Sequence, residues 1–444
     1  MSAVRERQRA QRERARRALI LGGLLLCALM LPIRLTHAQE STGETEPSLL
    51  EKAGLTGSVR AGYWSSTRVL DPEDHLGAGM VWLKSTRQVS PRVSLLVEGW
   101  TALRGPAGDG DATGELREAF VDLRFGRLDV RAGRQIIAWG RADGLNPTDN
   151  LTGEDLTLLA PDDDDRRLGT TAVRASYYLG DVSVTGFWLP EFRGHRFPLP
   201  PAPGFTFVRD RPEWPGDQWA FRVEQTGRAV DWSASYFRGR DLTPDVSVRL
   251  GAVTPDREAV IALSHHRIHV FGADMAANLG RIGLRAEGAY VDTEDRAGRD
   301  PFTKNPFLFV VVGGDRTFRE YLNLNIQYLY RFVRGHRTVQ AGLSPSEAGV
   351  AELQGILSSQ TKRVQHGASF RVSYKWLRET LEGECAAAGF FGPDGLAFRP
   401  KVTYTVTDHW KVLVGAEIYR GDSSSVFGLL RPNSTAYLEA RWSF

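Results

Sequence analysis

The sequence predicts an all-β fold, a transmembrane antiparallel β-barrel of about 16 strands, with roughly 14 to 18 as the range. Segments that alternate apolar and polar residues recur along most of the chain, which is the period of a β-strand. Their polar faces are dense in charge, and their apolar faces carry Tyr and Trp toward the segment ends. A soluble sandwich also alternates, but this combination of faces is typical of a barrel whose outside contacts lipid.

Residues 1–38 are predicted to be a secretory signal peptide. Seven arginines in the first 17 residues precede the uncharged apolar block 18–33, and Ala38 supplies the small residue that a signal peptidase requires. A membrane-anchoring helix is an alternative, but Arg34 ends the block short of the roughly 20 apolar residues that a spanning helix needs. A twin-arginine signal and a lipoprotein signal at Cys27 are weaker alternatives, because the residues that normally surround those motifs are missing.

Removal of this leader changes the charge of the protein. It takes away eight of the 56 Lys+Arg and two of the 53 Asp+Glu, which leaves 48 against 51 and a net charge of three negative. Nucleic-acid binding therefore loses its main support, and no such partner is predicted. Of the two cysteines only Cys385 remains, so no internal disulfide is expected. The polar residues 39–54 are predicted to form a short periplasmic segment that is too small to be a plug domain.

Residues 55–444 are predicted to form the barrel in the bacterial outer membrane. In FRVSYKW at 370–376, for example, Phe, Val, Tyr and Trp alternate with Arg, Ser and Lys. After the leader no stretch is long and apolar enough for a spanning helix, and only helices and closed barrels satisfy their backbone groups in lipid. The predicted strands are 55–64, 76–86, 91–101, 115–125, 127–138, 169–179, 181–189, 217–226, 229–238, 259–270, 281–292, 307–314, 318–333, 361–376, 379–391, 396–406, 409–420 and 434–444.

The connections between these strands are expected to alternate in length, with short periplasmic turns and long external loops. A short loop helix is possible at 344–359. The expected tight turns are 125–128, 179–182, 279–282 and 406–410, and the expected long loops are 190–216, 239–258, 293–306, 334–360 and 421–433.

The last strand, YLEARWSF, is apolar on one face up to its end. Leu438, Trp442 and Phe444 lie on that face, and the pattern resembles the carboxy-terminal signal that outer-membrane barrels present to their assembly machinery. These three residues are therefore the expected assembly signal. An ordinary last strand is the alternative.

One stretch, 133–169, breaks the strand pattern. It is too long for a turn, and a loop of this length without regular structure is usually functional or disordered. Leucines at 145, 151, 156, 158 and 159 argue against disorder, because such residues need a surface to pack on. We expect the loop to fold inward at about 140–168 and to narrow or cover the lumen.

This stretch, with the strands beside it, resembles a family of porin-like outer-membrane proteins, mostly of unknown function. The family shares an Arg-Gln pair, a Trp-Gly pair and an Asn-Pro-x-Asp motif after a strand. The matching residues are Arg134, Gln135, Trp139, Gly140, Asn146, Pro147 and Asp149. The resemblance covers about 40 residues and implies a barrel that passes a solute, without naming the solute.

The chemistry of the stretch indicates a site in the pore. Asn146-Pro147 is expected to start a turn, and Asp149 to cap the next one. The run of four aspartates at 162–165 suits either a divalent cation or a solvated surface, and the second reading is favoured because the spacing fits no known calcium loop. No metal site is predicted. The predicted pore residues are Arg134, Gln135, Trp139, Arg141, Asp143, Asn146 and Asp149.

The polar faces of the strands are expected to line a lumen of mixed charge, which favours polar or charged solutes. The residues expected there are Arg92, Glu98, Arg131, Arg174, Arg222, Glu224, Arg285, Glu287, Arg371, Lys375 and Arg399.

A catalytic site is not predicted. Ser264 with His265 and His266, and Asp408 with His409, supply the residue types of a triad, but only geometry identifies one. The predicted function is a channel for small hydrophilic or charged solutes, without a cofactor. The alternatives are a barrel that serves an export or partner complex (polysaccharide, lipid or a cytochrome sheath) and, less favoured, a hydrolase. Expected partners are outer-membrane lipid and lipopolysaccharide, the assembly machinery, a small solute and possibly further copies of the chain.

Overall fold

The structure is a computed structural model. It describes residues 54–68, 74–105, 111–198, 205–209, 214–227, 229–249, 259–336 and 342–444. The predicted signal peptide at 1–38, and the predicted periplasmic segment apart from Gly54, lie outside the described residues.

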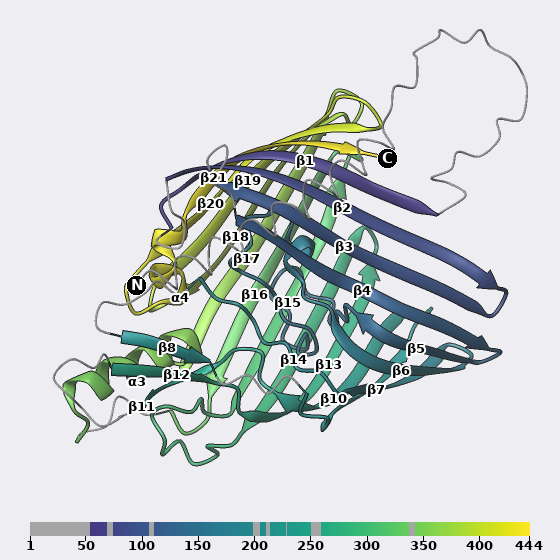
Figure 1. The fold of residues 1–444 in the computed structure, drawn as a ribbon. Coiled ribbons are helices and arrows are strands. Elements are labelled where there is room, and N and C mark those ends of the chain that lie inside the picture. The colour runs from purple at the N-terminus through teal and green to yellow at the C-terminus, as the bar shows by residue number, and fades with distance from the viewer. Residues whose placement is uncertain are drawn as a thin grey trace, which may run out of the picture.

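Eighteen strands form one closed antiparallel barrel (Figure 1). Each strand pairs with the next along the chain, except that β8, β11 and β12 are left out of the ring, and β1 closes it against β21. The barrel strands are Leu55–Ser66 (β1), His75–Ser90 (β2), Val93–Gly105 (β3), Asp111–Phe125 (β4), Leu128–Gln135 (β5), Thr170–Leu179 (β6), Val182–Leu189 (β7), Gln218–Gln225 (β9), Val230–Arg240 (β10), Arg267–Leu279 (β13), Ile282–Thr293 (β14), Phe307–Phe318 (β15), Leu322–Val333 (β16), Val364–Trp376 (β17), Leu381–Phe391 (β18), Gly395–Thr405 (β19), Trp410–Gly421 (β20) and Thr435–Ser443 (β21).

The two faces of the strands differ as the alternation predicted. On β16, Ile326 and Tyr328 are 55% and 48% exposed, whereas Asn325 and Gln327 are 7% and 5% exposed. Side chains that follow one another along a strand point to opposite faces, so the apolar set lies outside and the polar set inside. The barrel is therefore apolar toward its surroundings and polar within, the reverse of a soluble protein.

The seam between the first and last strands includes the last residue of the chain. Gly57 and Phe444 exchange two backbone hydrogen bonds of 3.0 Å, which extend the β1–β21 ladder beyond Ser443. The ring of Phe444 packs against the indole of Trp442, with their centroids 5.2 Å apart.

The prediction of a barrel with 14 to 18 strands is confirmed, with 18 observed. The tenth predicted strand, 259–270, is wrong. It combines β12 (Ala259–Ser264), which belongs to a separate small sheet, with the start of β13, and the chain breaks between them at His265 and His266. An apolar run identifies a strand but not the sheet that the strand joins, and this caused the error.

The connections between strands differ in length at the two ends of the barrel, as predicted. The four expected tight turns all join strands at one end, and the longer connections lie at the other. Of the charges expected in the lumen, Arg92 is an exception, because it lies exposed in the turn between β2 and β3.

The long connections carry a small cap. The strands β8 (Phe205–Arg209), β12 and β11 (Asp245–Arg249) form a three-stranded sheet, and α3 (Pro345–Leu357) packs against β11 (Figure 1). Ser344 and Glu347 form a capping box that starts α3, so the predicted loop helix is confirmed. Among the described residues, the other helical turns are η1 (Asp163–Arg166), α4 (Val426–Leu429) and η2 (Arg431–Asn433). Within the described ranges, no helix is long and apolar enough to cross a membrane.

Candidate functional site

The segment 136–169 between β5 and β6 is a long connection that contacts strands around most of the barrel wall. Its contacts reach from β1 through β9, β13, β14, β16 and β17 to β19, β20 and β21, which lie on all sides of the ring. The wall residues in these contacts are Arg60, Glu224, Asp274, Glu287, Gln327, Arg371, Arg399, Glu417 and Arg441. A segment with such contacts crosses the space that the strands enclose.

Glu287 of β14 accepts four hydrogen bonds from this segment. Its side chain is 2% exposed. One carboxylate oxygen accepts hydrogen bonds from the backbone N–H of Arg141 at 2.7 Å and of Ala142 at 2.9 Å. The other accepts from the backbone N–H and the hydroxyl of Thr148, both at 2.8 Å. Four charge-assisted hydrogen bonds therefore hold both ends of the turn 140–148 on one buried carboxylate.

Gly140 makes this close approach possible. Its φ is +95°, and a Cβ atom there would lie 2.5 Å from both carboxylate oxygens of Glu287. Gly144, four residues on, also has a positive φ of +84°, but a Cβ atom there would meet nothing within 4 Å. The two glycines thus share the backbone requirement and differ in the contact with Glu287.

This difference gives a matched pair of substitutions. We expect Gly140→Ala to displace Glu287 and to loosen the segment, whereas Gly144→Ala has only the cost of a positive φ, about 1 kcal/mol. Limited proteolysis of the folded barrel would measure this, with faster cleavage near residues 140–150 expected in Gly140→Ala alone. Equal cleavage rates in the two variants would contradict the role given to the Glu287 contact.

Two predicted pore residues bridge the segment to the wall by ion pairs. The guanidinium of Arg141 donates to Asp274 at 2.6 Å and to Glu224 at 2.8 Å. The carboxylate of Asp143 pairs with Arg371 of β17 at 3.0 Å, and its backbone exchanges hydrogen bonds with the amide of Gln327. Arg141 thus binds strands on one side of β14, namely β13 and β9, and Asp143 binds strands on the other side, namely β16 and β17.

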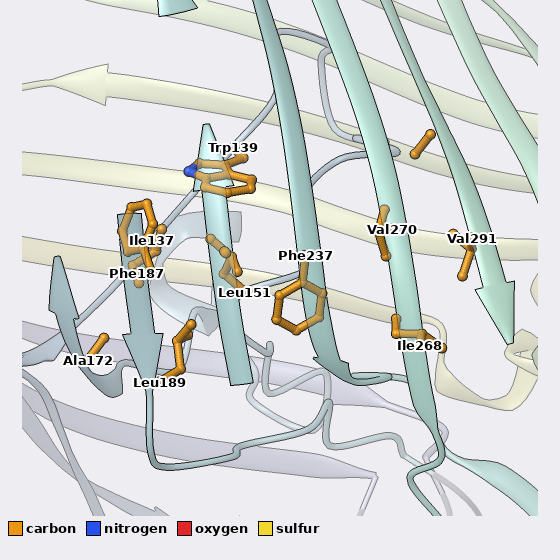
Figure 2. Close-up of a cluster of buried hydrophobic side chains, with 12 residues drawn as sticks. Ile137, Trp139, Leu151, Ala172, Phe187, Leu189, Phe237, Ile268, Val270 and Val291 are labelled. Carbon is orange, nitrogen blue, oxygen red and sulfur yellow. The ribbon is translucent and has the colours of Figure 1, made fainter. Parts of the chain in front are cut away.

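Trp139 is a packing residue. With Ile137 and Leu151 of the same segment it belongs to a buried apolar cluster against the barrel wall, and its ring meets that of Phe187 edge-on at 5.5 Å. Figure 2 shows these three side chains facing the strands. The wall residues of the cluster that Figure 2 labels are Ala172, Phe187, Leu189, Phe237, Ile268, Val270 and Val291.

Asn146 starts a turn, as predicted, since its carbonyl accepts from the backbone N–H of Asp149 at 3.2 Å. The predicted capping role of Asp149 is wrong. Its carboxylate accepts instead from the backbone N–H of Trp139 and from Arg167 at 2.9 Å. Burial raises the pKa of Asp149 to about 6, against the opposing influence of Arg167.

Arg134 and Gln135 are the last two residues of β5, directly before the segment 136–169 begins. Arg134 pairs with Glu191 at 2.9 Å, in a network that also joins Arg193 to Glu115 at 2.8 Å. Gln135 is 1% exposed and donates to the carbonyl of Ala172 at 3.0 Å. Their contacts are those of structural residues.

The aspartates at 162–165 are only in part the solvated run that the sequence predicted, because Asp163 and Asp164 are exposed. Asp162 pairs with Arg441 at 3.0 Å, Asp163 with Arg399 at 2.6 Å and Asp165 with Arg60 at 2.5 Å. Three of the four carboxylates therefore neutralise arginines of β1, β19 and β21. No group of three or more His, Cys, Asp or Glu in the described ranges is arranged to hold a metal ion.

A cavity of about 1040 Å³ lies between the segment and the wall from β14 to β21. Of the predicted pore residues, Asp143, Asn146 and Asp149 line it, whereas Arg134, Gln135, Trp139 and Arg141 do not. Small side chains on β18 and β19 make room along that wall, among them Ala386, Ala388 and Ala397. The charged residues that line it are Arg68, Asp143, Asp149, Glu154, Asp162, Asp163, Asp164, Asp165, Arg166, Arg167, Asp241, Lys304, Arg331, Arg371, Glu384, Arg399, Lys401 and Glu417.

Several charged residues that contact the segment or line the cavity were not predicted from the sequence. Asp274 lies beyond the end of the misplaced tenth strand, so it had no predicted face. Lys304 lies in a long connection, where alternation gives no signal. Glu417 alternates with the apolar Ala416 and Ile418 of its strand and was recognisable from that pattern.

The candidate catalytic residues do not meet. Ser264, His265 and His266 lie in the connection between β10 and β13, at the capped end. Asp408 and His409 lie in the short turn between β19 and β20, at the other end. A triad requires hydrogen-bond contact, so these residues form none.

A closed antiparallel barrel of this size, apolar outside and charged within, is an outer-membrane β-barrel of the porin type. The chain belongs to the DUF1302 family of proteins of unknown function, whose model matches residues 107–444. No protein of curated function matches the sequence.

Solved structures share this fold. OccAB3 of Acinetobacter baumannii is 10% identical, with a TM-score of 0.52, 88% of this chain covered and 98% of that one. OccD3 (OpdP) of Pseudomonas aeruginosa is 11% identical, with a TM-score of 0.51, 88% of this chain covered and 91% of that one. OccAB1 of Acinetobacter baumannii is 12% identical, with a TM-score of 0.51, 91% of this chain covered and 99% of that one. The likeness concerns the fold, and the protein is an outer-membrane barrel.

Proposed function

We propose that this barrel is a channel through which small hydrophilic or charged solutes diffuse across the outer membrane, and that the segment 136–169 narrows it. The observation that carries the proposal is the cavity of about 1040 Å³ inside the ring, lined by the segment on one side and by strands on the other. A barrel that served only as a scaffold would gain nothing from a space of this size at its centre, because packed side chains stabilise more than a cavity does.

The charges of the cavity support polar solutes. Positive and negative groups lie on facing surfaces, as with Asp163 on the segment and Arg399 on β19. A polar solute exchanges its hydration shell for these groups, whereas a long apolar molecule would have to desolvate them. The proposal includes no enzymatic reaction and no cofactor.

Liposome swelling tests the proposal. Liposomes that contain the refolded protein should swell in solutions of uncharged sugars, fastest with a pentose and more slowly as the sugar grows to a trisaccharide. Protein-free liposomes are the control. Swelling no faster than the control for every sugar would contradict a diffusion channel.

We further propose that lipid and lipopolysaccharide cover the exposed apolar belt and that the assembly machinery recognises the last strand. The belt includes side chains from strands far apart in the ring, such as Phe221 of β9 at 53%, Ile326 of β16 at 55% and Val414 of β20 at 50% exposure. On the last strand, Leu438 is 47% exposed on that same face. Contacts between copies of the chain would use part of the same belt.

Phe444→Asp is expected to leave export intact and to impair assembly. The substitution puts a charge beside the β1–β21 seam and removes the aromatic face of the proposed signal. Heat-modifiable barrel in outer-membrane fractions would be measured, with Phe444→Tyr as the matched control that keeps the ring. Normal amounts of folded barrel in Phe444→Asp would contradict the signal role.

A further inference from the structure

Arg331 of β16 differs from other cations of the cavity. Arg166, Arg167, Lys304, Arg371, Arg399 and Lys401 each have a carboxylate within ion-pair distance. Arg331 has no such carboxylate among the described residues. Its Nε also lacks a hydrogen-bond partner there, a feature that it shares with Arg166, Arg371 and Arg399. Asp241, an acid that lines the same cavity, is held by Lys304 at 2.6 Å.

The surroundings of Arg331 fix its guanidinium. The group lies over the rings of Phe307 and Phe309, at 4.5 and 4.9 Å from their centroids, and one of its terminal nitrogens donates to the carbonyl of Ser358 at 2.8 Å. Stacking orients the guanidinium while leaving N–H groups at its edge available for an acceptor. Arg331 and both phenylalanines line the cavity.

An apolar surface adjoins this cation. Phe309 belongs to a buried cluster with Val311 and Leu329, and Phe307 and Leu145 pack against it. Leu145 comes from the segment 136–169 and also lines the cavity. The cavity thus has two parts. Along β19 to β21 its charged side chains are paired with one another, and around Arg331 apolar side chains surround a cation that has no carboxylate partner among the described residues.

We propose that Arg331 binds the carboxylate of a small organic anion whose apolar body lies on Phe307, Phe309 and Leu145. A carboxylate gains two parallel hydrogen bonds from a guanidinium edge, and at Arg331 it breaks no existing ion pair to do so. At Arg399 or Arg371 the same anion would first have to displace a carboxylate of the protein. The inference rests on the proposed function, because it names the solute class of the same cavity.

Equilibrium binding to the folded, detergent-solubilised full-length protein tests this site without requiring conduction. Isothermal titration would compare benzoate, acetate and benzyl alcohol, with empty micelles as the blank. We expect benzoate to bind at least about tenfold more tightly than acetate, because acetate lacks the apolar body, and than benzyl alcohol, because that molecule lacks the charge.

Variants locate the site. Arg331→Gln should weaken benzoate about tenfold or more, and Phe309→Ala should weaken benzoate but not acetate. Arg378→Gln, in the exposed turn at the other end of the barrel, removes one charge as a control and should change nothing. If Arg331→Gln fails to give a heat-modifiable barrel, Arg331→Lys replaces it, because an ammonium keeps the charge but cannot form the bidentate pair.

Benzoate binding that survives in the folded Arg331 variant would overturn the proposal, as would inorganic phosphate binding as tightly as benzoate. A protein that binds benzoate through Arg331 but carries no solute in liposomes would keep this site and refute the channel. A protein that carries solutes but does not bind benzoate would refute this site alone.

Discussion

A barrel from which residues 145–165 are excised is expected to conduct several times more current than the intact protein. The excised stretch supplies the side of the cavity that faces β19 to β21, so its loss leaves those strands without an opposing surface. It also removes Asp162, Asp163 and Asp165. Arg60 then has no carboxylate partner among the described residues, and Arg441 and Arg399 keep only Glu439 and Glu417 on the wall. The pore should therefore become anion-selective as well as wider.

Planar-bilayer recordings in a salt gradient would measure both effects, from the step size and the reversal potential. The control replaces Asp164 by Asn, because its side chain is 92% exposed and its loss leaves the three wall arginines paired. An excised barrel that still folds but keeps its conductance would place this stretch outside the path of the ions.

Glu287→Gln is expected to release the turn 140–148 from the wall while the barrel stays folded. Both oxygens of Glu287 accept from N–H or O–H donors, so an amide nitrogen at either position would face a donor. Hydrogen bonds to a charged group contribute roughly 1.5–3 kcal/mol each, so the loss of even two of them outweighs most other contacts of the turn. Current recordings should show larger and more variable open levels than in the unaltered protein.

The matched control is Glu379→Gln, which removes a carboxylate from an exposed turn at the other end of the barrel and leaves the segment untouched. The barrel of both variants should still show heat-modifiable migration, because the strand ladders do not depend on Glu287. Steady currents of normal size in Glu287→Gln would show that the segment is held by its other contacts.

The strands were predictable because the alternation of apolar and polar residues in each strand follows from the two environments on its two faces. A side chain in a barrel strand faces either lipid or the interior, so the period of two is visible in short stretches such as 370–376. The tenth strand failed because 259–264 has the same apolar character in the small cap sheet as it would have in the barrel. Composition identifies a strand, and only long-range pairing decides its neighbours.

The inner segment was recognisable from its length and its leucines, but its contacts were not. The aspartates at 162–165 look like a solvated run, because their partners Arg60, Arg399 and Arg441 lie more than 90 residues away in the chain and converge only when the barrel closes. Glu287 was expected in the lumen, yet nothing in the sequence indicated that four donors of the segment meet on it. Pairing across a closed ring depends on the register of every strand between the partners.

Single-channel recording of the purified, refolded protein in a planar bilayer tests the central claim most directly. We expect discrete open steps, with a reversal potential in a salt gradient that shifts toward anions when residues 145–165 are removed. A well-folded, heat-modifiable barrel that inserts into the bilayer and passes no current would contradict it.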